Sequence, residues 1–176
     1  MLEKAFWVPI FTNKVDLSLI KLTDGSVSKT FGSEVETSFD QKNTLEHSSV
    51  KYLNEIFVSN LDQVIHCPYT FHIFEIWRNH YKVGDFQEKH IHTHMQYSFI
   101  IYEKMKGKSK TVFIRPNAYL NNHCYDGDEF GFREFYRPEK EQGDMIMFPS
   151  TLEHFVEKAT EKYTTISGNL KVKLEK

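Results

Sequence analysis

Short strand-like runs, spaced about ten residues apart, divide the chain from residue 69 onward and restrict what it can fold into. The first, YTFHIFEIWRNHY over 69–81, is rich in aromatic and β-branched residues. Turn-forming pairs such as Asn121-Asn122 and Gly143-Asp144 separate the later runs. Strands this short and regular predict an all-β sandwich or barrel. The later runs lie near 86–92, 96–103, 110–115, 129–136, 144–149, 154–157 and 163–172.

The first third of the chain has a different pattern. Apolar residues recur at three- and four-residue steps over 50–65, which predicts one amphipathic helix packed outside the barrel. Ser48-Ser49 is the expected cap, and Cys67-Pro68 ends the helix. The apolar run 6–11 predicts an edge strand because it contains Pro9, and the polar stretch 24–49 predicts a loop. We therefore expect one domain over 1–176, with an N-terminal strand and helices over 1–68 and a β core over 69–176.

Composition excludes several classes of protein. A length of 176 residues fits one domain. With 22 basic and 24 acidic side chains, the chain lacks the basic excess of a nucleic-acid binder. No apolar run approaches the length of a membrane span, and the N-terminus does not resemble a signal peptide. Cys67 and Cys124 do not make a disulfide framework. These features predict a cytoplasmic protein with no nucleic-acid or membrane partner.

Histidines concentrate in GDFQEKHIHTHMQYSFIIY, residues 84–102. On an extended chain His90 and His92 point to the same face and can reach one ion. A third ligand is expected from a remote segment, and His154 follows the turn at Pro149 in GDMIMFPSTLEHF. Imidazole suits iron, zinc, copper and nickel. The pattern predicts a metal site of His90, His92 and His154, with His94 as an alternative to His92. A solvated histidine-rich strand without metal is the competing interpretation.

These segments resemble the cupin superfamily, because Gly84 precedes His90-x-His92 and Gly143 precedes Pro149 and His154 at the spacing of the two cupin motifs. The closer resemblance is to a small family of 2-oxoglutarate/Fe(II)-dependent oxygenases, many of them from phages and marine bacteria. It rests on PIFTNKVDL, WRNHY, GDFQEKHIH, SFIIY, GDMIMFPSTLEH and YTTISGNL. The resemblance implies a double-stranded β-helix (cupin or jelly-roll) barrel with one or two flanking helices. It also implies Fe(II) held by His90, His92 and His154, with 2-oxoglutarate as cosubstrate, in the host cytoplasm if the protein is phage-encoded.

The wider oxygenase superfamily that the chain resembles uses a His-x-Asp/Glu…His motif, whereas the middle position here is His92. Three neutral imidazoles leave a divalent site at roughly +2, which dianionic 2-oxoglutarate or the thiolate of a small substrate would offset. The superfamily also implies a basic residue after the distal histidine for the far carboxylate of 2-oxoglutarate. Lys162 is the candidate, with Arg115 and Arg78 in reserve, although lysine lacks the bidentate fork of arginine. Thr164, Ser167 and Asn169 are expected to add neutral hydrogen bonds.

The preferred function is a non-haem Fe(II) dioxygenase that couples decarboxylation of 2-oxoglutarate to hydroxylation of a substrate that the sequence does not identify. One alternative is a three-histidine cupin metalloenzyme that does not use 2-oxoglutarate, and succinate production separates the two. Another is a metal- or ligand-binding barrel without turnover. The polar, aromatic stretch 116–139 is expected to form a substrate mouth or lid, or else a surface hairpin. Pairing of two copies through a sheet edge is a further expectation.

Overall fold

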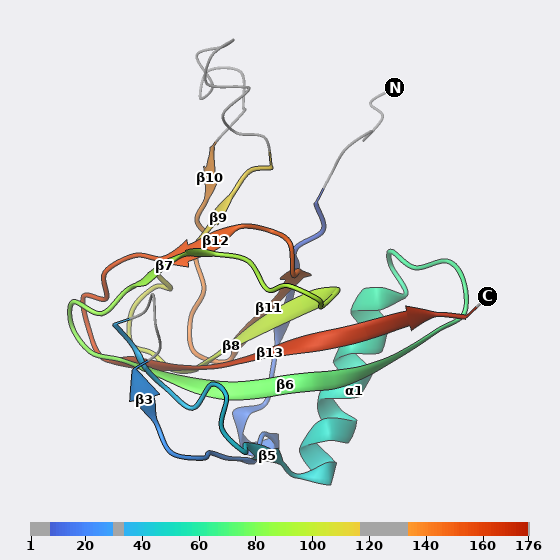
Figure 1. Ribbon diagram of the computed structural model, residues 1–176, viewed down its shortest axis with the longest axis horizontal. Coiled ribbons are helices and arrows are strands. Elements are labelled where there is room, and N and C mark those ends of the chain that lie inside the picture. Colours follow the sequence, from blue (N-terminus) through green and yellow to red (C-terminus); the bar gives the residue numbers. More distant parts are fainter. Residues whose placement is uncertain (1–7, 30–33, 117–133, 176) are drawn as a thin grey trace.

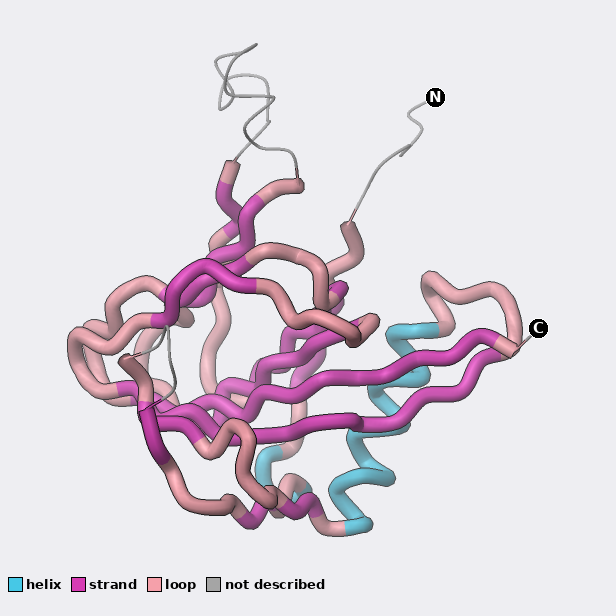
Figure 2. Tube along the Cα trace, viewed as in Figure 1, coloured by secondary structure: helices cyan, strands magenta, loops and turns pink. Residues whose placement is uncertain are grey.

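The computed structural model describes residues 8–29, 34–116 and 134–175, and within them two antiparallel sheets lie face to face with a helix outside (Figure 1). The major sheet has the strand order β1-β11-β8-β13-β6-β4-β3 and the minor sheet the order β10-β9-β12-β7. The tube in Figure 2 shows that strands dominate the described chain. This is the double-stranded β-helix that the sequence resemblance implies, so the expected fold class is confirmed.

The elements have the following bounds, in chain order. The N-terminal part contains β1 (Phe11–Lys14), the 3-10 helix η1 (Leu17–Leu19), β2 (Leu22–Thr23), β3 (Ser28–Lys29), β4 (Glu36–Thr37), β5 (Thr44–Leu45) and α1 (His47–Leu61). The core contains β6 (Tyr69–Tyr81), β7 (Gln87–His90), β8 (Tyr97–Lys104), β9 (Thr111–Ile114), β10 (Phe135–Tyr136), β11 (Asp144–Pro149), β12 (His154–Val156) and β13 (Tyr163–Leu174). The predicted strands over 69–81 and 144–149 match β6 and β11 in both bounds.

The helix exists as expected, but both of its predicted ends are wrong. It begins at His47 after Glu46, and Ser49 lies inside it. The buried Ser49 hydroxyl donates to the carbonyl of Leu19 at 2.7 Å and accepts from the backbone N–H of Lys21 at 2.9 Å. The serine therefore fastens the helix to the preceding chain and does not cap it. Within the described residues, no helix combines the length and the apolarity needed to cross a membrane.

The region 24–49 is less irregular than its polar composition predicts. It contains the two-residue strands β3, β4 and β5, and β4 pairs with β6 through Glu36–His80 and Thr37–Asn79. Strands this short carry no hydrophobic period, which is why the sequence gives no signal for them. The edge strand predicted over 6–11 is observed instead over Phe11–Lys14, as β1 beside β11, so its predicted bounds are wrong. Residues 8–10 are not in a strand, and residues 1–7 lie outside the described chain.

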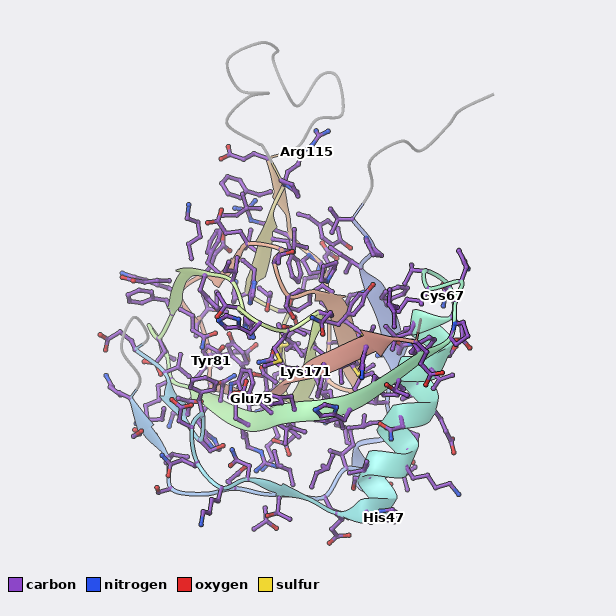
Figure 3. All side chains as sticks on the ribbon, turned by 45° about the vertical axis from the view of Figure 1, so that its right-hand side comes forward. His47, Cys67, Glu75, Tyr81, Arg115 and Lys171 are labelled. Atoms are coloured by element: carbon purple, nitrogen blue, oxygen red, sulfur yellow. The ribbon has the colours of Figure 1, made fainter. Side chains whose placement is uncertain are left out.

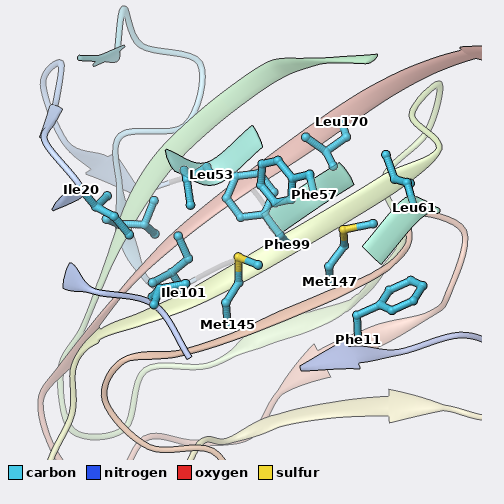
Figure 4. Close-up of a cluster of buried hydrophobic side chains, with 12 residues drawn as sticks. Phe11, Ile20, Leu53, Phe57, Leu61, Phe99, Ile101, Met145, Met147 and Leu170 are labelled. Atoms are coloured by element: carbon cyan, nitrogen blue, oxygen red, sulfur yellow. The ribbon is translucent and has the colours of Figure 1, made fainter. Parts of the chain in front are cut away.

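Two hydrophobic layers enclose the major sheet. On one face, α1 packs Leu53, Phe57 and Leu61 against side chains from β8, β11 and β13, as Figure 4 shows. On the other face, a second cluster fills the space toward the minor sheet. Because β8 and β11 are buried on both faces, their sequences read as continuous apolar runs rather than alternating ones. The second cluster includes Ile100, Tyr102, Phe113, Ile146, Phe148 and Tyr163.

Strand β13 divides its side chains between these two layers. Ile166 and Leu170 belong to the helix-side cluster. Tyr163, Thr165 and Ser167 face the space between the sheets. An irregularity in the pairing of β13 with β6 sets Asn169 opposite Glu75 and Leu170 opposite Ile73, which leaves Phe74 as an extra residue. A bulge of this kind shifts the side-chain alternation along the bulged strand.

Gly168 lies between Ile166 and Leu170 of the helix-side cluster, and a methyl group there would overlap the Phe99 ring and lie 2.7 Å from the backbone oxygen of Glu75. We expect Gly168→Ala to lower the free energy of unfolding by about 1–3 kcal/mol, the usual cost of overpacking. Urea-induced unfolding measures this loss of stability. Gly107→Ala is the matched control, because the atom that its methyl group meets is the carboxylate end of the Glu161 side chain, which can move. Equal stability of the two variants would contradict this account of Gly168.

Candidate metal centre

Three histidine rings converge between the two sheets. His90 ends β7, His92 lies two residues further on, and His154 begins β12 directly opposite His90 in the β7–β12 pair. One ring nitrogen from each residue can be chosen so that all three atoms lie within 4.8 Å of one another. His154 is only 3% exposed and His90 and His92 are partly buried, so the three rings form a cluster between the sheets and not a solvated histidine-rich strand.

Each of these rings has its Nδ1 atom engaged by an oxygen. Nδ1 of His90 lies 2.6 Å from the carbonyl of Glu88, and Nδ1 of His154 lies 2.9 Å from the carbonyl of Leu152. Nδ1 of His92 lies 2.7 Å from Oδ1 of Asn169. Because carbonyl oxygens only accept, Nδ1 must carry the proton in each neutral ring. The lone pair of every ring is then on Nε2, and this arrangement suits three metal ligands.

Burial keeps these rings in the form that binds metal. Desolvation lowers the pKa of His90 and lowers the pKa of His92 to about 4. Desolvation, reinforced by the neighbouring histidines, also holds the pKa of His154 well below its ordinary value. The rings are therefore neutral near pH 7, and their nitrogen donors suit a divalent iron, zinc, copper or nickel ion. The residues present fit a mononuclear metal centre with three protein ligands.

Aromatic side chains hold the histidine rings in place. Trp77 of β6 stacks on His92 with ring centroids 5.8 Å apart, and Phe148 of β11 meets His154 edge to face at 4.9 Å. The backbone N–H of His92 donates to the carbonyl of Ser150 at 2.9 Å. Rings fixed on both sides keep their nitrogens aimed at one point without an ion to organise them.

The triad opens onto a narrow chamber lined by hydroxyl and amide groups. Tyr81 and Tyr163 stack with their ring centroids 4.2 Å apart, and the Tyr81 hydroxyl donates to Oε1 of Gln87. Burial raises the pKa of both tyrosines, so their hydroxyls remain protonated donors. In the described part of the chain, no lysine or arginine lines this chamber. The lining polar residues are Asn79, Tyr81, Gln87, Thr111, Tyr163, Thr165 and Ser167.

Asn79 lies at the base of this polar surface. Its Nδ2 atom donates to Oγ1 of Thr165 at 3.3 Å and to Oγ of Ser167 at 3.2 Å. Its buried Oδ1 atom has no hydrogen-bond partner among the described residues. Tyr163 is only 6% exposed and lines the same chamber. Unpaired buried polar atoms are costly, so Oδ1 of Asn79 is a candidate for contact with a bound molecule.

Two of the residues predicted to bind the cosubstrate lie at the centre, and Asn169 has a role that the sequence did not predict. Ser167 lines the chamber. Asn169 lies behind His92 and contacts its ring. Lys162 is exposed, and it alternates with the inward-facing Tyr163. Thr164 likewise does not line the chamber.

The two arginines held in reserve are also elsewhere. Arg115 follows β9 and lines a groove on the outer side of the minor sheet, far from β6 (Figure 3). Arg78 forms a two-pronged ion pair with Glu103 and a further one with Asp24. His94 is exposed and has a left-handed backbone, with φ of 67°, so it is not part of the cluster. Most of the stretch 116–139 that was expected to form a mouth or lid, residues 117–133, lies outside the described chain.

Sequence reasoning missed the inward-facing Tyr163 and Thr165, as well as Asn79. A usable signal existed, since Tyr163, Thr165, Ser167 and Asn169 recur at every second position and a strand points such residues to one face. The expectation of a basic residue after His154 led instead to Lys162, which is exposed and does not belong to this alternating set.

Comparisons with known proteins agree with this geometry. The family described as "Putative 2OG-Fe(II) oxygenase" matches residues 75–169, more than half of the chain. No curated protein matches the sequence. An oxidoreductase of the 2OG-Fe(II) oxygenase family from Burkholderia pseudomallei is similar in structure, with a TM-score of 0.53 and 12% identity over 92% of this chain and 67% of that one.

Two prolyl hydroxylases are similar to the same degree. The prolyl-4-hydroxylase of Pseudomonas putida has a TM-score of 0.54 and 13% identity over 82% of this chain and 77% of its own. The prolyl hydroxylase of Trichoplax adhaerens, solved with a hypoxia inducible factor peptide fragment, has a TM-score of 0.53 and 12% identity over 85% and 70%. At this identity the likeness concerns the fold.

The geometry generates a direct metal-binding prediction. We expect Co(II), added without oxygen, to bind the protein at one ion per chain, and His154→Ala to abolish this stoichiometric binding because only two ligands remain. An equilibrium titration monitored by visible absorption measures the number of Co(II) ions bound per chain. His94→Asn is the matched control, since asparagine tolerates the left-handed backbone and His94 lies outside the cluster. Loss of binding in the His94 variant but not in the His154 variant would contradict the assignment.

Proposed function

Because this chain belongs to the 2OG-Fe(II) oxygenase family, we propose that His90, His92 and His154 hold its Fe(II) and that the neighbouring chamber receives 2-oxoglutarate. The enzyme is an oxidoreductase, and Fe(II) and 2-oxoglutarate are its cofactor and cosubstrate. The observation that carries the residue assignment is the convergence of three ring nitrogens whose Nδ1 partners leave Nε2 free.

Charge supports the pairing of this donor set with a dianion. Three neutral imidazoles leave a bound Fe(II) at +2, and 2-oxoglutarate carries −2, so the loaded centre is close to neutral in a buried site. When bound, the iron and the keto acid together supply dioxygen activation, in which decarboxylation to succinate is coupled to hydroxylation of a substrate. The stacked aromatic residues around the rings limit the access of water to the centre.

We propose that neutral donors, rather than Lys162, hold the far carboxylate of 2-oxoglutarate. Tyr163, Thr165 and Ser167 share the chamber face of β13. The Tyr163 hydroxyl stays protonated because burial raises the pKa of this side chain. A carboxylate that accepts hydrogen bonds from such donors gains charge-assisted bonds, which are stronger than neutral ones. The predicted site residue Ser167 thus keeps its role, with Thr165 and Tyr163 added.

The hydroxylated substrate is left open by this proposal. The peptide bound in the Trichoplax adhaerens prolyl hydroxylase belongs to that protein, and a likeness at 12% identity does not transfer it to this chain. A pairing of two copies, predicted from the sequence, also stays a prediction.

Turnover tests the proposed function. We expect the protein with Fe(II), oxygen and 2-oxoglutarate to form succinate, and His154→Ala to form none, because the remaining two ligands do not retain the ion. Without oxygen, Fe(II) and 2-oxoglutarate should give a weak visible charge-transfer band that the variant lacks. Oxygen consumption without succinate would instead favour a three-histidine metalloenzyme that does not use 2-oxoglutarate.

The carboxylate anchor has its own test. We expect Tyr163→Phe to raise the KM for 2-oxoglutarate about 10-fold to 100-fold, since a hydrogen bond to a charged group contributes roughly 1.5–3 kcal/mol. The phenylalanine ring keeps the stacking on Tyr81. Lys162→Ala should leave this KM unchanged. The opposite result, a large rise in the lysine variant alone, would restore Lys162 as the anchor.

A further inference from the structure

His92 differs from the other two rings in what holds it. Nδ1 of His90 and His154 is bound by backbone carbonyls, which can only accept. Nδ1 of His92 is bound by the side chain of Asn169, whose amide has an accepting end and a donating end. An asparagine can therefore select either tautomer of His92, depending on which way its amide points. Something else must fix the direction of that amide.

Glu75 supplies the missing constraint. Its Oε2 atom accepts from Nδ2 of Asn169 at 2.7 Å. A carboxylate only accepts, so the donating end of the amide must face Glu75 and the accepting Oδ1 must face His92. The Ser98 hydroxyl donates to the same Oδ1 at 2.8 Å, which agrees with this direction. The amide orientation thus follows from the hydrogen-bond network.

The fold builds this row of residues across three adjacent strands. Asn169 of β13 lies directly opposite Glu75 of β6 on one side and Ser98 of β8 on the other. Glu75 alternates along β6 with Trp77, Asn79 and Tyr81, which line the chamber, so its side chain lies on the face of the sheet that carries His92. Asn169 is 3% exposed and Ser98 is 1% exposed, while Glu75 is partly buried, so the amide at the centre of the row is shielded from water.

We propose that Glu75 and Asn169 form a positioning relay, in which the carboxylate of Glu75 orients the Asn169 amide and thereby fixes His92 with its proton on Nδ1 and its lone pair on Nε2. The relay also brings a negative charge to a donor set that has none of its own. Hydrogen bonds in a chain polarise one another, so the carboxylate increases the electron density that Asn169 offers to His92 and makes the ring a stronger ligand. This inference deepens the proposed function, since it rests on His92 as a metal ligand.

The substitution Glu75→Gln tests the relay with little change of shape. Glutamine can present either an oxygen or an NH₂ group, so the amide of Asn169 becomes free to turn. We expect the ring of His92 to become a mixture of tautomers in the metal-free protein, while His90 and His154 keep the Nδ1–H form. Long-range ¹H–¹⁵N NMR spectra of the histidine rings measure this, with the two carbonyl-bound rings as internal controls.

Metal affinity gives a second measurement. We expect the dissociation constant for Co(II) to rise about tenfold in Glu75→Gln, the lower end of the range for loss of a group that orients a ligand. Glu55→Gln, which makes the same change at an exposed position of α1, should leave both the ring tautomers and the affinity unaltered.

The tautomer of the His92 ring decides whether the relay exists. If His92 keeps a single Nδ1–H form in Glu75→Gln, the relay is wrong whatever the affinity. If His92 becomes mixed only in that variant, the relay is supported. A wild-type protein that binds no Co(II) would overturn the proposed metal centre, whereas the ring tautomers of the metal-free protein would still report on the relay. The two failures are therefore distinguishable.

Discussion

The antiparallel pairing of β12 with β7 is the contact on which the rest of the centre depends. It places His154 directly opposite His90, although more than sixty residues of sequence separate them. His92 lies just after β7, and its backbone N–H donates to the carbonyl of Ser150. Ser150 belongs to the turn that precedes His154, so this bond holds His92 beside His154. Backbone hydrogen bonds between two short segments thus set the positions of all three rings. Side chains only refine the directions in which the rings point.

The sequence was sufficient to predict the histidine cluster and most strands, because both signals are local. Alternation of His90 and His92 needs only an extended chain, and the aromatic, β-branched runs identify β6, β8 and β11 without knowledge of their partners. The ends of α1 were missed for a tertiary reason. Ser49 bonds to Leu19 and Lys21, which a local cap rule does not consider, and Val64 and Ile65 continue the apolar period because they still pack on the same cluster after the helix has ended.

The faces of β13 were harder to assign, because the strand is buried on both sides. Tyr163, Thr165, Ser167 and Asn169 share a face, but Thr164 beside Thr165 blurs the alternation in the sequence. The sequence prediction chose Lys162 as the carboxylate anchor because of its charge, whereas Tyr163 is the residue that lines the chamber. The role proposed for Glu75 had no sequence signal, because it depends on the register that sets Glu75 opposite Asn169, and only the pairing of β6 with β13 reveals that register. A register is defined by two strands together and cannot be identified from one.

The described residues that line the chamber include no lysine or arginine, which agrees with the charge of the proposed metal centre. A divalent ion on three neutral rings and a dianionic cosubstrate sum to about zero. A lysine or arginine in the same buried space would leave one positive charge without compensation, at a cost of several kcal/mol per ion. Hydroxyl donors such as Tyr163 can orient a carboxylate without adding charge. Glu75 fits the same balance, because it lies outside the chamber and acts on His92 only through the neutral amide of Asn169. The neutral chamber and the indirect carboxylate both agree with a proposed centre in which a third imidazole takes the place of an anionic ligand.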